Sequence, residues 1–205
     1  IAGGNVTLLA GAENQFEYAE ETGEDARMRP GDGVALLGDR LVFADSNNHV
    51  IRRIDRNNIV STIVGNYSAG AGFSGDFGPA TQAQLDGPDG VCFAPDGDLI
   101  VADSHNDRVR RIDKQTQTIM TIAGSGEGGY DGDEKPALEA RLNNPSGVAA
   151  ASNGDIYIAD TLNYRVRMID HATRFIHTIA GDGRAGEDED DVGDIIGVGG
   201  DDDEV

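Results

Sequence analysis

The sequence predicts an all-β fold, a β-propeller built of four-stranded antiparallel blades, of which this chain supplies about three blades and part of another. Three observations lead to this prediction. One pattern occurs three times in phase, each copy holds four short runs of strand type, and turn residues separate those runs. The 29 glycines and the aromatic fraction of 5% agree with many turns and a core of small and β-branched residues.

The repeat is anchored by an aspartate that ends an apolar run. The three runs are LVFAD (41–45), LIVAD (99–103) and IYIAD (156–160), so the aspartates are 58 and 57 residues apart. A second aspartate follows each of them by ten residues, and a proline precedes each by fifteen. Such a fixed period indicates structural units that are stacked because each is too small to bury its apolar surface alone.

Each unit is predicted to form four strands. In the second unit they cover Val91–Ala94, Leu99–Ala102, Arg108–Ile112 and Ile119–Ala123. Short turns join them, which is typical of an antiparallel meander. A lone sheet of this kind leaves a face uncovered, and stacking copies around an axis covers it, which gives a propeller. A linear β-solenoid is the rival architecture, but its units are much shorter.

The repeat spacing divides the chain into five parts. They are the end of a preceding repeat with its connector (1–29), three repeats (30–84, 85–141 and 142–181), and an acidic, Gly-rich tail (182–205). The acidic runs of the tail lack the ligand spacing of an EF-hand loop, so a solvated segment is favoured over a calcium site.

Two segments carry a resemblance to a known family. They are PDGVCFAPDGDLIVADSHNDRVRRID (88–113) and PSGVAAASNGDIYIADTLNYRVRMID (145–170), which resemble the NHL repeat. The connectors, with their TIAG, GD and PA elements, look like the long-linker NHL repeats of bacterial surface proteins and teneurins. The resemblance implies a propeller that usually has six blades. About half of one is present, so closure would need further blades or a second chain.

Turn residues recur at the end of the second strand of each unit. An asparagine stands three residues after the anchoring aspartate, where it is expected to take left-handed geometry and bond local backbone. Two units place an arginine two residues later, and we expect it to pair with the aspartate across the hairpin. The first unit has Val50 there, which predicts a looser turn. These turn residues are Asp45, Asn48, Asp103, Asn106, Arg108, Asp160, Asn163 and Arg165.

The connectors between repeats make each unit longer than a typical propeller repeat of about 40–45 residues. Phe73 and Asp76 in the first match Tyr130 and Asp133 in the second. Connectors that leave each blade at the same point emerge on one face, and repeat proteins often bind partners through such a face. The alternative, which recurrence in phase favours, is that the two aromatic side chains cap the gap between blades.

Nucleotide binding and catalysis are not predicted. Gly124, Gly126 and Gly129 match G-x-G-x-x-G, but acidic residues follow them and no parallel βαβ unit surrounds them. Propellers similar to amidating lyases and lactonases hold a metal with side chains of their innermost strands. By resemblance these strands begin here at Gly33, Gly90 and Gly147, and their first three residues include no histidine or carboxylate. We therefore expect no cofactor and no enzyme activity, with a propeller enzyme completed by other blades as the alternative.

Charge and composition restrict the partners. The formal net charge of −21 argues against nucleic acid and anionic membranes, and no apolar run is long enough for a membrane helix. The glycosylation sequons at Asn5 and Asn66 point to an extracellular or cell-surface protein. The predicted function is that of an interaction or structural module that binds protein, glycan or copies of itself.

Overall fold

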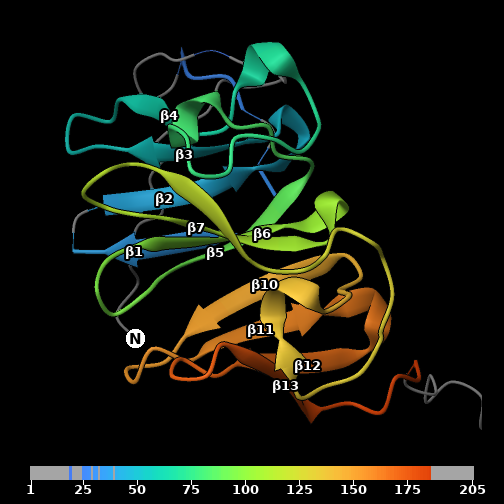
Figure 1. Ribbon diagram of the computed structural model, residues 1–205. Helices are drawn as coiled ribbons and strands as arrows, with labels where there is room; N and C mark the ends of the chain where they lie inside the picture. The colour runs from blue at the N-terminus through green and yellow to red at the C-terminus, as the bar shows by residue number, and fades with distance from the viewer. Residues whose placement is uncertain (1–18, 20–24, 29, 32, 39, 186–205) are drawn as a thin grey trace, which may run out of the picture.

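The computed structural model describes residues 19, 25–28, 30, 31, 33–38 and 40–185, which form three antiparallel sheets packed face to face (Figure 1). Blade 1 holds β1 (Val34–Leu37), β2 (Arg40–Asp45), β3 (Val50–Ile54) and β4 (Val60–Val64). Blade 2 holds β5 (Pro88–Phe93), β6 (Leu99–Asp103), β7 (Arg108–Ile112) and β8 (Ile119–Ala123). Blade 3 holds β10 (Pro145–Ala150), β11 (Ile156–Asp160), β12 (Arg165–Ile169) and β13 (Phe175–Ala180).

In every blade the strands pair in sequence order, as the predicted meander requires. The all-β propeller-blade architecture is therefore confirmed. The predicted strands of blade 2 agree closely with the observed ones, except that β5 starts at Pro88 rather than Val91 and ends at Phe93. The difference arises because a register shift lets Pro88 pair with Asp103 beyond the regular ladder that begins at Val91.

The hydrophobic core lies between blades. One apolar cluster joins blades 1 and 2 and includes Val42, Ile51, Leu85, Val101 and Ile119. A second joins blades 2 and 3 and includes Ile100, Val109, Leu142, Ile158 and Ile176. Blade 2 is covered on both faces, which explains why its β6 reads as a continuous apolar run and is buried at every residue.

The outward faces of blades 1 and 3 have no neighbouring blade among the described residues, although Ala26 and Met28 cover Phe43 and Val60 on blade 1. Val34 and Leu36 on β1 are 63% and 67% exposed. Val166 on β12 is 37% exposed, whereas Val109, at the equivalent position of blade 2, is fully buried. Each end of the three-blade stack therefore presents apolar side chains where an inner blade buries them.

The tight hairpin turns lie on one side of the stack, and the 3₁₀ turns and the connectors lie on the other. Three-residue 3₁₀ turns join the second and third strands: η2 (Ser46–Asn48), η5 (Ser104–Asn106) and η7 (Thr161–Asn163). The long connectors leave from the same side, at the right of Figure 1, and the tight hairpin turns lie at the left. This side, the connector side, holds almost all of the irregular backbone.

The connectors do not stay on that side. The second one forms β9 (Lys135–Pro136), which pairs with β13 as a fifth strand, then η6 (Ala137–Glu139). In the first, a bridge joins Pro79 to Thr118 beside β8, next to η4 (Ala80–Gln82); η3 (Tyr67–Ala69) lies earlier in the same connector. Each connector thus runs along the outer edge strand of the following blade, where it covers hydrogen-bonding groups that would otherwise be open.

A close backbone approach explains the first glycine of each connector. A Cβ on Gly124, whose φ is +93°, would lie 2.1 Å from the carbonyl oxygen of Asp107. Gly65 and Gly181, at the same place in the other units, would meet the carbonyls of His49 and Tyr164. The glycine is therefore required by the turn it passes.

We expect Gly124→Ala to destabilise the chain more than Gly132→Ala, as measured by urea unfolding. Both residues have positive φ, +93° and +99°, but a Cβ on Gly132 has no atom within 4 Å. The shared φ strain is about 1–3 kcal/mol, so the excess loss in Gly124→Ala reports the close carbonyl. Equal losses would show that the Asp107 carbonyl can move away from the added Cβ without any loss of stability.

Candidate functional site: the blade tops and the connectors

A buried ion pair lies at the connector side of every blade. It joins the anchoring aspartate to an arginine seven residues later, and all six side chains are fully buried. The pairs and their N–O distances are Arg52–Asp45 at 3.3 Å, Arg110–Asp103 at 3.1 Å and Arg167–Asp160 at 3.2 Å. Removing such charges from water is costly, so the remaining polar atoms need partners.

The recurrent asparagine supplies one of these partners. Asn106 Nδ2 donates to Asp103 at 2.9 Å and also to the carbonyl of Gly72, in the preceding connector, at 2.9 Å. Asn163 does the same with Asp160 at 2.8 Å and Gly129 at 2.7 Å. Asn48 donates to Asp45 at 3.0 Å. The asparagine therefore ties the aspartate to the connector.

The left-handed geometry belongs to the following residue. Asn48, Asn106 and Asn163 each end a 3₁₀ turn, and positive φ occurs at His49, Asp107 and Tyr164, with φ between 51° and 57°. The expectation that the asparagine itself is left-handed was wrong, because its side chain is used inside the blade.

The predicted pairing of Arg108 with Asp103 was also wrong. The two residues are opposite each other in strand register, but the guanidinium of Arg108 donates to the carbonyls of Asn106 and Ser125 at 3.0 and 2.8 Å. Arg165 likewise donates to the carbonyls of Asn163 and Asp182, both at 2.9 Å. The partners of the aspartates are Arg110 and Arg167, two residues further along.

The first blade consequently keeps its ion pair. Val50 stands where the other units have the arginine that was expected to pair with the aspartate. Asp45 nevertheless bonds Arg52 and Asn48, as the equivalent aspartates do in the other blades. The expected loosening of this turn was wrong. The sequence does contain the missed signal, since an arginine follows the aspartate by seven residues in all three units.

The connector acids complete the network. Arg110 Nη2 donates to Asp76 at 2.8 Å, and Asp76 also accepts from Thr121 at 2.8 Å. In the next unit, Asp133 accepts from Arg167 at 2.9 Å and from Thr178 at 3.0 Å. Arg110 and Arg167 therefore each lie between an aspartate of their own blade and one of the preceding connector.

The connector aromatic side chains lie against the same arginines. The Phe73 ring centroid is 3.8 Å from the guanidinium carbon of Arg108 and 4.8 Å from that of Arg110. Tyr130 lies at 3.8 and 5.0 Å from Arg165 and Arg167. These distances are within the range of cation–π attraction. Each ring therefore lies on two arginines of the following blade, and both rings remain about 40% exposed (41% and 39%).

Gly126 allows Arg108 to take this position. A Cβ on Gly126 would lie 2.0 Å from the guanidinium, and Gly183 stands in the same relation to Arg165. The second glycine of the motif is thus explained by packing of an arginine, in the second and third units.

Burial and hydrogen bonding shift these carboxyls in opposite directions. Burial raises the pKa of Asp103 and of Asp160, against the lowering effect of their hydrogen bonds. For Asp133, partial burial raises the pKa, but the hydrogen bonds from Thr178 and the charge of Arg167 outweigh it, so the pKa lies below its ordinary value.

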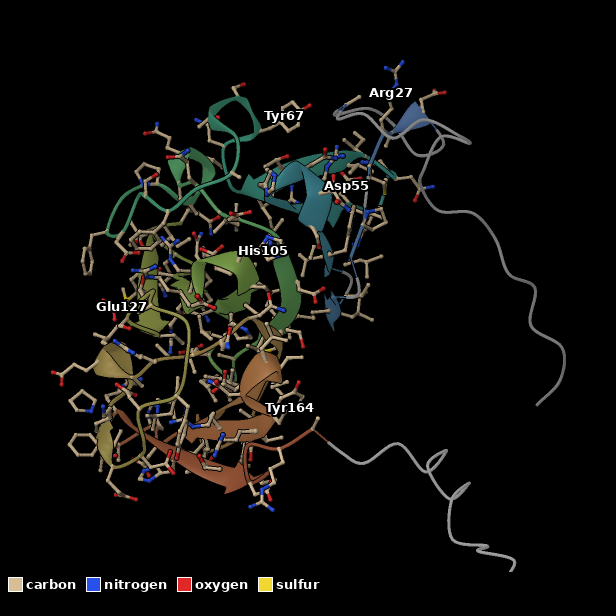
Figure 2. All side chains as sticks on the ribbon, turned by 90° about the vertical axis from the view of Figure 1, so that its right-hand side faces the viewer. Arg27, Asp55, Tyr67, His105, Glu127 and Tyr164 are labelled. Atoms are coloured by element: carbon tan, nitrogen blue, oxygen red, sulfur yellow. The ribbon has the colours of Figure 1, made fainter. Side chains whose placement is uncertain are left out.

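A polar hollow of about 290 Å³ opens on the connector side near the inner strands. Its lining includes His49, His105 and Asp89, and Asp86 lies 3.4 and 3.2 Å from the two histidines. His105 is labelled in Figure 2, which looks onto this side. No group of three or more metal-ligand side chains occurs within the described part of the chain.

Other sequence-based candidates are placed as follows. Asn66 is partly buried at the start of η3, and Asn5 lies outside the described residues. Cys92 is a free thiol in β5, and burial raises its pKa to about 11. Among the described residues no helix is long and apolar enough to span a membrane.

Comparison with known proteins identifies the family that the repeats match. Residues 85–112 and 142–167 match the family model described as NHL repeat. The chain is 36% identical over 99 residues to Protein SUPPRESSOR OF QUENCHING 1, chloroplastic, of Arabidopsis thaliana, covering 48% of this chain and 9% of that protein. It is 28% identical over 189 residues to human NHL repeat-containing protein 2, covering 86% and 26%, and 29% identical over 111 residues to human Teneurin-4, covering 48% and 4%. The chain thus spans at most about a quarter of these relatives.

Solved structures share the fold. An auxiliary nutrient binding protein from Bacteroides ovatus superposes with a TM-score of 0.59 at 22% identity, covering 78% of this chain and 40% of that one. A gluconolactonase from Xanthomonas campestris gives 0.52 at 14% identity, covering 75% and 48%. At these identities the likeness concerns the fold alone.

We expect Arg110→Met to cost about 3–5 kcal/mol, because it leaves Asp103 buried without its cation. Arg108→Met should cost about 1 kcal/mol, since Arg108 is partly exposed and bonds only carbonyls. Urea unfolding followed by circular dichroism measures both. If the two variants lose the same stability, the assignment of Arg110 as the aspartate's partner is wrong.

The lowered pKa of Asp133 predicts a pH-dependent contribution to stability. The carboxylate stabilises the folded chain fully above its unfolded pKa, near 4, and that contribution is lost as pH falls through the lower, folded pKa. Asp133→Asn removes the titration. We expect the difference in unfolding free energy between wild type and Asp133→Asn to be constant above about pH 5 and to shrink below about pH 4.

Glu139→Gln, at an exposed position of the same connector, controls for the loss of one negative charge. A difference between wild type and Asp133→Asn that stays the same from pH 3 to 7 would contradict the contribution assigned to Asp133.

Proposed function

Because this chain belongs to the NHL repeat family, we propose that it is a non-catalytic interaction module that binds a partner protein through its connectors. The family supplies a scaffold of β-propeller blades, and within each blade a buried ion pair joins the second and third strands. The connectors are the parts of that scaffold that differ most between units while remaining firmly anchored.

The observation that carries the proposal is the exposure of aromatic side chains along the connectors. Phe77 is 79% exposed and Tyr67 is 44% exposed, and one side of Phe73 and of Tyr130 is open to solvent. We call these four residues the connector aromatics. Aromatic side chains are enriched at protein interfaces because they give a large contact area at little entropic cost.

Anchoring makes the connectors suitable for recognition. Asp76 and Asp133 bond buried arginines, so the adjoining backbone is held in one conformation before a partner binds. Preorganised loops avoid an ordering penalty on binding. The overall charge of −21 favours a partner with a basic surface, which would associate faster at low salt. A glycan remains the alternative partner.

The absence of catalysis is part of the proposal. The inner strands of blades 2 and 3 carry small or apolar side chains at the positions nearest the axis, including Val91, Val148 and Ala149. Asp89 lies in β5 at the polar hollow. Asp32, the matching residue of the first unit, lies outside the described residues. The second candidate is a propeller enzyme whose metal site other blades complete, and the two histidines of the hollow favour it. A tightly bound, stoichiometric divalent ion in the full-length protein would replace our proposal with this one.

Two further expectations stay predictions. Location outside the cell is supported by the Asn66 sequon, whose asparagine lies on a connector. Self-association is supported by the exposed apolar faces at Val34, Leu36 and Val166, which sedimentation at rising concentration would measure.

The interaction is tested with a photo-crosslinking amino acid at position 77, in an extract of the source organism. We expect a specific partner to be crosslinked from position 77 but not from position 59, an exposed apolar site away from the connectors (41% exposed, against 79% for Phe77). Once that partner is produced, Phe77→Ala should weaken its binding by at least about tenfold, as for an interface hot spot, and Ile59→Ala should not. Equal crosslinking from both positions, or no effect of Phe77→Ala on affinity, would refute the proposal.

A further inference from the structure

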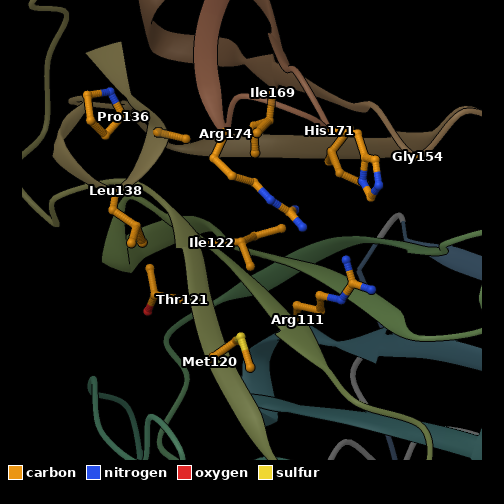
Figure 3. A pocket seen from close by; sticks show the side chains of 12 residues that line it. Arg111, Met120, Thr121, Ile122, Pro136, Leu138, Gly154, Ile169, His171 and Arg174 are labelled. Carbon is orange, nitrogen blue, oxygen red and sulfur yellow. The ribbon is translucent and has the colours of Figure 1, made fainter.

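A cavity of about 310 Å³ lies between blades 2 and 3, near the tight-turn side (Figure 3). Its walls come from β8, from the connector around η6, and from the hairpin turns of blade 3. Most of the wall is apolar, formed by Met120, Ile122, Pro136, Leu138, Ile156 and Ile169. Three basic side chains, Arg111, His171 and Arg174, stand at its rim.

The same place between blades 1 and 2 provides an internal comparison. A cavity there is lined by equivalent residues, among them Ile63, Leu99 and Ile112, but has a volume of only about 90 Å³. Phe93 lines this smaller cavity. Its counterpart in blade 3 is Ala150, since both residues end the inner strand and pair with the first residue of the next strand. Phe93 packs on the core between blades 1 and 2, whereas the smaller Ala150 packs on the core between blades 2 and 3, beside the larger cavity.

The rim also differs between the two cavities. Lys114 and Gln117 in the smaller one correspond to His171 and Arg174 in the larger one. Lys114 donates to the carbonyl of Asp96, within its own blade. The two cavities therefore differ both in volume and in the position of the cation at the rim.

Arg174 is the cation that remains available. Arg111 is neutralised by Asp96 and Asp98, at 2.5 and 2.8 Å. The Arg174 guanidinium, in contrast, has no hydrogen-bond acceptor or ion-pair partner among the described residues. Figure 3 shows its side chain extending across the cavity towards Ile122, with His171 beside it.

We propose that this cavity binds a small organic acid with an apolar body. Its carboxylate pairs with Arg174, and its apolar body lies on Ile122, Leu138, Ile156 and Ile169. The volume is at the lower end of the roughly 300–1,000 Å³ of ligand pockets, which fits a small molecule. The nearby carboxylates of Asp96 and Asp98 disfavour a doubly charged phosphate.

The probe is octanoate, titrated into the full chain and followed by amide chemical shifts, with 1-octanol as the uncharged control. We expect octanoate to bind saturably, with shifts confined to the residues around the cavity, and to bind at least about tenfold more tightly than octanol. Equal binding of the two would overturn the proposal, because the carboxylate would then contribute nothing.

Two substitutions copy the smaller cavity into the larger one. Arg174→Gln installs the residue found at position 117, and should lower octanoate affinity about tenfold while leaving octanol binding unchanged. Ala150→Phe installs the residue found at position 93, and should abolish binding of both probes by filling the space. Thermal unfolding verifies that each variant is folded. If Ala150→Phe does not fold, the Arg174→Gln variant provides the test, because Arg174 is exposed. Unchanged octanoate affinity in Arg174→Gln overturns the proposal.

Discussion

The structure depends on one costly element, an arginine buried inside each blade. A fully buried guanidinium opposite a fully buried aspartate is stable only if nearly every remaining polar atom is bonded. Here a neighbouring asparagine, backbone amides and a connector aspartate provide those bonds. The unit cannot be folded halfway, because a missing connector would leave Arg110 or Arg167 with buried, unsatisfied donors.

This requirement gives the connectors their form. An acid must reach the arginine, an aromatic ring must cover it, and a glycine must pass the left-handed turn. Having met these constraints, the same segment pairs with the outer edge of the next blade. One stretch of irregular chain thereby satisfies buried charge, closes a sheet edge and presents aromatic side chains to solvent. The connectors are long because they perform these tasks at three separate places.

Repeat spacing predicted the architecture well because strand order and turn positions follow directly from a local period. The ion pairs were harder to predict. Register places Arg108 opposite Asp103, yet the connector bonds turn the aspartate towards Arg110, and that choice depends on chain 30 residues away in sequence. The apolar cavity was beyond prediction for a related reason. A change from Phe93 to Ala150 has meaning only once the two are known to lie at equivalent places, Phe93 between blades 1 and 2 and Ala150 between blades 2 and 3.

The path of the connectors also has a consequence for synthesis of the chain. The segment that satisfies the buried arginine of a blade is always upstream of that blade, as with Gly72 and Asp76 for blade 2. The apolar face of the same blade is covered by residues downstream, as Val109 is by blade 3. A blade emerging from the ribosome can therefore pair its buried arginine at once, while one largely apolar face stays open. Each blade thus leaves the ribosome with its internal charge already neutralised but with a sticky outer face, and the next blade is the first surface able to cover it.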